Sequence, residues 1–232
     1  MSADDGMNSQ IKGMDDRLYR MRHSAAHMMA KAVLDLFPDA KIAIGPPVEH
    51  GFYYDFDLPR ALTPDDLSVL EENMRAQMRQ DLPFIPSEIS KGEAVARFHD
   101  QPYKLEIIEG IGDEQVGLYA HDSFVDLCAG PHVESTSKVG AFKLMNVAGA
   151  YWRGDAARPQ LQRVYGVLFA TQQELDAYLA MLEEARRRDH RRLGRELGLF
   201  TFSDDIGSGI PLFLPAGERI RHTMCRSCTS RT

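Results

Sequence analysis

The sequence predicts an α+β fold in which helices and short antiparallel strands are interspersed. Residues 16–37 repeat apolar side chains at intervals of three and four, which is typical of an amphipathic helix. Residues 51–56 and 162–169 are instead short and rich in aromatic or β-branched residues, as strands are. No internal repeat accompanies these patterns. With 232 residues, 44% of them hydrophobic and 26% charged, the chain has the composition of a soluble globular protein.

The first third of the chain predicts two helices and a hairpin. Residues 1–15 are polar and without period, so we expect them to be disordered. After the helix at 16–37, residues 41–47 and 51–56 predict two paired strands. Thr63 followed by Pro64 is a helix start signal, and the helix it opens should end before Pro83.

The middle of the chain reads mostly as strands. Pro86 confines the segment 84–89 to a sheet edge. A short helix is expected around residues 92–98. The further predicted strands are 104–108, 117–120, 126–128, 142–147 and 162–169.

The last predicted helix begins with a capping box, Thr171 to Glu174, and should continue to about Leu197. Its second half carries six arginines between Arg186 and Arg195. Such a cluster is either a phosphate-binding surface or a solvated helix face, and the sequence favours the solvated face.

Two histidine motifs about a hundred residues apart are the strongest functional signal. His23 and His27 are four residues apart on the predicted helix, so their imidazoles share one face. Cys128 and His132 have the same spacing, but Gly130-Pro131 between them predicts a turn at the end of a strand. All four side chains are zinc ligands by type. Spacing alone leaves open whether the two motifs meet in one site.

Composition and charge limit the remaining classes. No apolar run is long enough to cross a bilayer, and the amino-terminal residues do not form a signal peptide. Three cysteines do not make a disulfide framework, so a reducing cytoplasm is the expected location. The net charge of −7 argues against nonspecific coating of nucleic acid. Cys225 and Cys228 would be half of a zinc site, but the other half is lacking.

A series of motifs in one order, from about residue 17 to 224, resembles bacterial threonyl-tRNA synthetases. The motifs are Arg22-His-Ser-Ala-Ala-His27, Ala43-Ile-Gly-Pro46, Gly51-Phe-Tyr-Tyr-Asp55, Tyr103-Lys104, Asp126-Leu-Cys-Ala-Gly-Pro-His-Val133, Phe142-Lys-Leu-Met145 and Ala148-Gly-Ala-Tyr-Trp-Arg-Gly-Asp155. They are long and numerous, so the resemblance is specific.

The resemblance implies a domain organisation. Residues 16–170 would form the two-layer editing domain shared with alanyl-tRNA synthetases, 171–199 the linker helix, and 200–224 a truncated start of the class II catalytic core. Residues 225–232 do not resemble the family. Because the ATP-binding, threonine-binding and anticodon-binding parts are missing, we expect this chain not to aminoacylate tRNA alone. A frameshift or truncated reading frame would account for the ending.

The function implied by the resemblance is hydrolysis of the ester in seryl-tRNA(Thr). Serine differs from threonine by one methyl group, which binding alone discriminates by roughly 1–3 kcal/mol. A second site that hydrolyses the wrong ester supplies the remaining fidelity. Such a site needs a positioned water, a proton acceptor and donors for the developing oxyanion.

The resemblance also assigns residues to this reaction. His23 and Lys104 would order and activate water and contact the ribose hydroxyls, while His27, Cys128 and His132 would line the catalytic site. Asp126 would bind the serine amino group. Tyr54 and the backbone at Gly45 would shape the amino-acid pocket. Tyr119 and His121 are expected to have supporting roles.

Cofactor and partner expectations follow from the same resemblance. Alanyl-type editing domains imply zinc at His23, His27, Cys128 and His132, whereas threonyl-type domains imply hydrolysis that requires no cofactor. We expect the metal-free reaction, with ATP used only by a full-length synthetase. The expected partner is tRNA(Thr) mischarged with serine, and no membrane association is expected. Full-length relatives would dimerise through the catalytic core that is missing here. The alternatives are a noncatalytic tRNA-binding module or inactive gene fragment, and a zinc-dependent deacylase of the alanyl-editing type.

Overall fold

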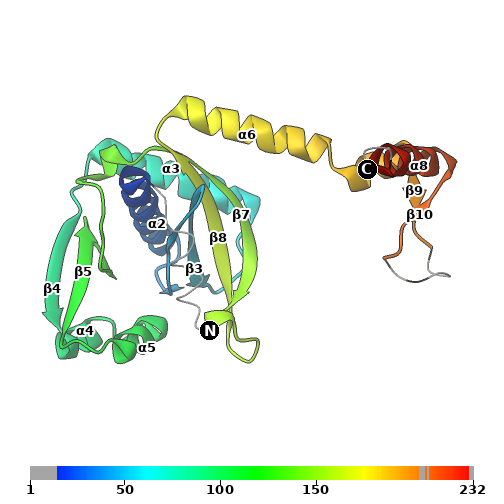
Figure 1. The fold of residues 1–232 in the computed structure, drawn as a ribbon. Helices are drawn as coiled ribbons and strands as arrows, with labels where there is room; N and C mark the ends of the chain where they lie inside the picture. The colour runs from blue at the N-terminus through cyan, green and yellow to red at the C-terminus, as the bar shows by residue number, and fades with distance from the viewer. Residues whose placement is uncertain (1–14, 204–206, 208, 230–232) are drawn as a thin grey trace. The chain divides into compact units, whose positions relative to one another are not determined.

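A computed structural model describes residues 15–203, 207 and 209–229, which divide into two compact units, Met1–Leu175 and Asp176–Thr232. The first unit holds the following main elements (Figure 1): α2 (Asp16–Leu36), β1 (Lys41–Ile42), β2 (Pro47–Val48), β3 (Gly51–Asp57), α3 (Pro64–Gln80), β4 (Ile85–Ser90), α4 (Lys91–Arg97), α5 (Pro102–Gly110), β5 (Gln115–His121), β6 (Phe124–Leu127), β7 (Ala141–Tyr151) and β8 (Gln160–Phe169). Short 3-10 turns lie at Thr136–Lys138 and Trp152–Gly154.

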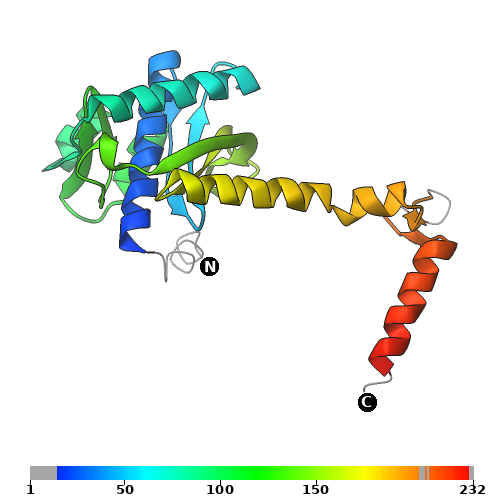
Figure 2. The same ribbon diagram turned by 90° about the horizontal axis from the view of Figure 1, so that it is seen from above.

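The larger sheet is antiparallel, with the order β1-β3-β8-β7 and with β2 paired to β3. Helices α2 and α3 pack against it, and Figure 2 shows the two helices crossing. At the crossing, the Gln77 amide donates a hydrogen bond to the carbonyl of Met28. The shared core includes Met28, Phe52, Phe56 and Leu70, all fully buried.

A smaller antiparallel sheet, β4-β5-β6, has its own core with α4 and α5. Helix α2 lies between this sheet and the larger one (Figure 1). One side of α2 can therefore contribute to the core of the larger sheet while another side meets the end of β6. The fold is α+β, as the sequence predicts.

Most local signals in the sequence are confirmed. The helix at 16–37 is α2, and the residues expected to pair as a hairpin pair as β1, β2 and β3. Thr63 caps α3 with a capping box completed by Asp66. The segment containing Pro86 is the edge strand β4.

Two predicted elements are wrong. Residues 104–108, expected as a strand, belong to helix α5, which begins with Pro102 at a position where a missing N–H costs nothing. A short apolar run does not distinguish a buried strand from a buried helical turn. The helix expected from 171 to 197 is two helices, α6 (Gln172–Arg187) and α7 (His190–Glu196), because the side chain of Asp189 caps a new start.

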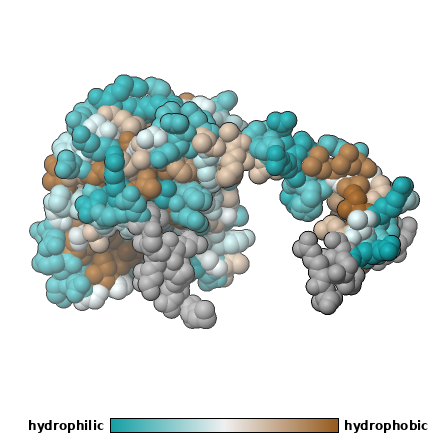
Figure 3. Space-filling model, turned by 45° about the horizontal axis from the view of Figure 1, so that its top comes forward, coloured by the Kyte–Doolittle hydropathy of each residue, from teal (hydrophilic) through white to brown (hydrophobic). Residues whose placement is uncertain are grey.

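The second unit contains α7, the strands β9 (Phe200–Thr201) and β10 (Leu212–Phe213), and α8 (Pro215–Thr229). The arginine side chains between 186 and 195 are exposed and several pair with neighbouring carboxylates, such as Arg188 with Glu184 and Arg191 with Asp189. This arrangement fits the solvated helix face. Apolar residues also reach the surface of this unit (Figure 3), among them Leu197 and Met224.

The expected disorder of residues 1–15 falls almost wholly outside the described residues, as do the last three residues of the expected tail. The domain boundaries at 170, 199 and 224 stay predictions. Within the described part of the chain, no helix combines the length and apolar character that a bilayer span requires.

Candidate active site

Four helices and strands of the first unit, together with one turn, deliver the predicted site residues to one place. Helix α2 supplies His23 and His27, strand β6 supplies Asp126, and the turn after it supplies Cys128 and His132. Helix α5 supplies Lys104, and β3 supplies Tyr54. Both histidine motifs therefore belong to one cluster, which the spacing of the motifs alone leaves open.

The histidine-cysteine cluster consists of His23, His27, Cys128 and His132, and one donor atom from each lies within 4.8 Å of the others. The Cys128 sulfur is 3.3 Å from Nε2 of His23 and 3.2 Å from Nε2 of His132. The rings of His23 and His132 stack with centroids 4.2 Å apart. His27 and His132 are buried, whereas His23 is partly exposed.

The hydrogen bonds around the cluster determine where its protons lie when no ion is bound. The carbonyl of Pro131 can only accept, so Nδ1 of His23, 3.2 Å away, carries the proton and Nε2 has the lone pair. Cys128 then donates its S–H to that lone pair, and its sulfur accepts from Nε2–H of His132. This leaves Nδ1 of His132 to accept from the hydroxyl of Ser24, 3.0 Å away.

This chain of hydrogen bonds is closed at both ends by backbone groups. At one end Ser24 is fully buried, and its oxygen also accepts from the N–H of Val133. At the other end Nδ1 of His23 meets the carbonyl of Pro131. Between the ends, the N–H of Gly130 donates to the Cys128 sulfur. Gly130 has φ of 71°, a conformation that favours glycine, and a side chain there would collide with Tyr119. The loop can therefore fold back over the sulfur only because residue 130 is glycine.

Burial keeps all members of the cluster neutral. Desolvation lowers the pKa of His23 to about 4 and that of His132 to about 2, and it also lowers the pKa of His27. The same cause raises the pKa of the Cys128 thiol to about 12. Neutral imidazoles and a thiol are the forms that the proton chain requires.

A second buried network, formed by Tyr54, Asp126 and Lys104, carries charge. The ammonium of Lys104 lies 2.5 Å from Oδ1 of Asp126 and donates to the Tyr54 hydroxyl at 3.0 Å. That hydroxyl donates to Oδ2 of Asp126 at 2.5 Å, and the N–H of Leu127 donates to Oδ1. Each of the three side chains is at most 3% exposed. Burial and the adjacent carboxylate raise the pKa of Tyr54, which holds the phenol as a donor.

The two networks adjoin at His27, whose Nε2 is 3.8 Å from Oδ2 of Asp126. This separation exceeds a hydrogen bond. Nδ1 of His27 is buried and has no hydrogen-bond partner among the residues that the structure describes.

Lys104 and Tyr54 are positioned by packing that lies behind them. Helix α5 is anchored by Tyr103, which donates to Asp57, and by Glu106, which accepts from the indole N–H of Trp152 and pairs with Arg158. Gly45 lies against the face of Tyr54, so that a Cβ at this position would be 2.0 Å from the ring. Gly45 thus shapes the site through its missing side chain.

The donor set fits a zinc ion. Three histidines and one cysteine supply four donors of the types that bind zinc tetrahedrally, with Cys128 as a thiolate. Nδ1 of His27, buried and without a hydrogen-bond partner among the described residues, is a group that an ion could satisfy. The hydrogen bond that Nδ1–H of His23 donates to the Pro131 carbonyl resembles those that orient zinc-binding imidazoles, and Nδ1–H of His132 would donate to the Ser24 hydroxyl in the same way if Nε2 of His132 held an ion. If bound, zinc would be held by His23, His27, Cys128 and His132 and would supply Lewis-acid chemistry.

Ser24 is the main site residue that sequence reasoning missed. It follows His23 directly and a serine inside an apolar helix face was a signal, but only its contacts with His132 and Val133 reveal its role. Tyr119 packs on the His132 ring, and His121 bonds Gln77; the supporting roles expected of both stay predictions.

Part of this site lies in a segment that matches a known family of domains. The profile described as "Threonyl and Alanyl tRNA synthetase second additional domain" matches residues 116–165, which include Asp126, Cys128 and His132. The threonine–tRNA ligase of Rubrobacter xylanophilus is 57% identical over 208 residues, 89% of this chain. Over most of its own length the chain is therefore similar to threonine–tRNA ligases.

Two further threonine–tRNA ligases match a similar share of this chain. The threonine–tRNA ligase of Dehalococcoides mccartyi is 56% identical over 202 residues, or 87% of this chain, and that of Gloeobacter violaceus is 50% identical over 214 residues, or 90%. The chain covers 33% of the Rubrobacter protein, 35% of the Dehalococcoides protein and 34% of the Gloeobacter protein. It therefore spans about one third of the length of these relatives, and the second additional domain lies within that third.

Proposed function

We propose that this chain hydrolyses the ester bond of tRNA(Thr) mischarged with serine, without a metal ion. The observation that carries the proposal is the juxtaposition of a neutral proton chain, His132-Cys128-His23, with the charged network Lys104-Asp126-Tyr54 in one buried site. The similarity to threonine–tRNA ligases and the matched second additional domain support an aminoacyl-tRNA as the substrate class.

His23 is the proposed residue that orders and activates water. It is partly exposed, and its protonated Nδ1 is held by Pro131, so the lone pair on Nε2 faces the interior of the site. A water that replaces the Cys128 thiol as the partner of Nε2 would be oriented for attack on an ester carbonyl. The lowered pKa of His23 keeps this lone pair available at neutral pH, although it makes the imidazole a weaker base.

Lys104 is the proposed donor to the substrate. An ammonium has three protons, of which two are directed at Asp126 and Tyr54, so one remains for the ester carbonyl or a ribose hydroxyl. Its charge would stabilise the oxyanion that forms during attack. Burial strengthens this effect because the surrounding medium screens charge poorly.

Asp126 is the proposed partner of the serine amino group. Its carboxylate already accepts from Lys104, Tyr54 and the backbone of Leu127. A carboxylate has about four lone-pair positions, so one acceptor site remains. Tyr54, pressed against Gly45, would limit the size of the pocket and disfavour the additional methyl group of threonine.

The decisive experiment compares deacylation of seryl-tRNA(Thr) and threonyl-tRNA(Thr) by the purified chain. We expect faster hydrolysis of the serine ester, and a loss of about 10²–10⁴-fold in His23→Ala. His99→Ala is the matched control, because His99 is exposed on the smaller-sheet side of the unit and outside the site. Equal hydrolysis rates for His23→Ala and His99→Ala would contradict the proposal.

Two alternatives are distinguished by this assay together with a metal analysis of the purified protein. A noncatalytic tRNA-binding module would bind the RNA without accelerating hydrolysis of either ester. A zinc-dependent deacylase of the alanyl-editing type would contain stoichiometric zinc when purified without added metal. The four-donor cluster is the observation that favours this alternative. The lack of aminoacylation by this chain alone and its cytoplasmic location remain predictions.

A further inference from the structure

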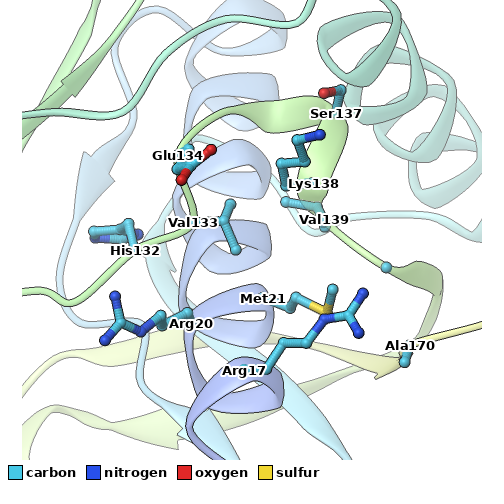
Figure 4. Close-up of a pocket in the computed structure, with 11 residues that line it drawn as sticks. Arg17, Arg20, Met21, His132, Val133, Glu134, Ser137, Lys138, Val139 and Ala170 are labelled. Atoms are coloured by element: carbon cyan, nitrogen blue, oxygen red, sulfur yellow. The ribbon is translucent and has the colours of Figure 1, made fainter.

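A groove on the first unit begins at the catalytic cluster and runs along the start of α2. Its volume is about 480 Å³, and Figure 4 shows the side chains that line it. His132 borders the groove at one end, and Ala170 lies at another (Figure 4). None of the site functions described above uses this groove.

The charged residues of the groove are mainly basic. Arg17 and Arg20 come from the first turns of α2, and Lys138 faces them from the segment before β7 (Figure 4). Glu134 is the one acidic side chain in the lining. Arg20 is paired with Asp16, whereas neither Arg17 nor Lys138 forms an ion pair with any residue in the described part of the chain.

This basic character contrasts with the whole chain, whose net charge is −7. Arginine presents a planar fork of donors that matches the oxygens of a phosphate, and lysine adds a mobile positive charge. Between the cations, the side chains of Met21, Val133 and Val139 form an apolar floor. A groove with a charged rim and an apolar floor fits a strand of unpaired nucleotides better than a free anion.

The groove is also connected to the chemistry. His132 lines it and at the same time donates to the Cys128 sulfur at 3.2 Å. Val133, the next residue in the lining, donates its N–H to Ser24. A nucleotide strand in the groove would therefore end beside the cluster in which the ester is hydrolysed.

We propose that this groove, with Arg17, Arg20 and Lys138, binds the phosphates of the unpaired 3′ end of an RNA and leads it to the site. The proposal rests on the proposed function for the identity of the RNA, but it concerns binding only. The cations would hold the strand in a defined direction without reading its bases.

The test measures binding of an uncharged hairpin RNA with four unpaired 3′ nucleotides to the 232-residue chain, by fluorescence anisotropy at several salt concentrations. The same hairpin with a blunt end is the RNA control. We expect tighter binding of the overhanging hairpin, and an affinity about tenfold lower for the double variant Arg17→Gln/Lys138→Gln at low salt. The dependence of log affinity on log salt should become shallower by about 1–2.

Arg97→Gln is the matched protein control, because Arg97 is exposed on α4 and outside the groove. Three results would each overturn the proposal: no binding by the unaltered chain at low salt, equal binding of the blunt and overhanging hairpins, or equal affinities of the double variant and Arg97→Gln. Because the RNA carries no amino acid, the two failures can be told apart: hydrolysis that is unchanged in His23→Ala, with RNA binding intact, would contradict the proposed function alone, whereas any of the three binding results would contradict this inference alone.

Discussion

The histidine-cysteine cluster and the Tyr54-Asp126-Lys104 network lie side by side, yet burial affects them in opposite ways. In the cluster, desolvation removes charge and leaves neutral groups joined by a chain of hydrogen bonds. In the network, an ion pair with a 2.5 Å contact is retained although its side chains are at most 3% exposed. The difference lies in partners: Lys104 has a carboxylate in direct contact to balance its charge, whereas the hydrogen-bond partners of His23 and His132 are the neutral Pro131 carbonyl, Ser24 hydroxyl and Cys128 thiol.

The neutral cluster and the charged network are suited to different tasks. The neutral cluster can hold and move a proton, because its lone pairs are free of competing positive charge. The charged network can stabilise a developing negative charge and hold an amino group. Variants that remove one property without the other test the assignment.

The largest effect on stability is expected from breaking the ion pair. Lys104→Met leaves the carboxylate of Asp126 buried without its counter-charge, which should lower the free energy of unfolding by about 3–5 kcal/mol. Urea denaturation measures the loss. In the double variant Lys104→Met/Asp126→Asn the loss should be much smaller than the sum of the two single losses; additive losses would show that the two groups are not coupled.

A smaller effect is expected from moving Tyr54 while the charges are kept. In Gly45→Ala the new methyl group overlaps the Tyr54 ring, which should cost about 1–3 kcal/mol and slow hydrolysis. Gly92→Ala is the matched control, since nothing lies within 4 Å of its added Cβ and it lies in helix α4. If Gly45→Ala retained wild-type stability and activity, the close approach of Gly45 to Tyr54 would not be needed.

The neutral cluster is tested through Ser24. Ser24→Ala removes the donor to His132 and the acceptor of Val133, leaving two polar groups without partners, at a cost of about 1–2 kcal/mol. Hydrolysis of the serine ester should fall as well, because the proton on His132 is no longer fixed at Nε2. The exposed Ser68→Ala is the control for the loss of a hydroxyl from a helix. Unchanged stability and hydrolysis in Ser24→Ala would argue against the proton chain.

The smallest effect is expected from chelation. If the cluster functions as a neutral hydrogen-bonded chain, EDTA should leave both the melting temperature and the rate of ester hydrolysis unchanged. A structural zinc ion contributes on the order of 10 kcal/mol of binding free energy, so its removal would lower the melting temperature clearly. A large drop on chelation would replace the proton chain by a metal site.

Much of the architecture follows from local sequence signals. Apolar periodicity gives α2 and places His23 and His27 on neighbouring turns, and Thr63 with Pro64 marks the start of α3. Gly130-Pro131 predicts the turn that returns His132 toward Cys128. These features depend on backbone preferences and on residues three or four apart, which a sequence displays directly.

Other features required the tertiary structure. Residues 104–108 form a helix because Pro102 begins one and because one face of that helix is buried. The apolar run by itself is equally compatible with a strand. The pairing of Lys104 with Asp126, the role of Ser24 and the basic groove beside His132 each join residues far apart in the chain. The order of residues along the chain settles which groups are available and which local elements carry them. Which of those groups are buried together depends on the packing of elements far apart in the chain, and the partners found there set which groups keep a charge.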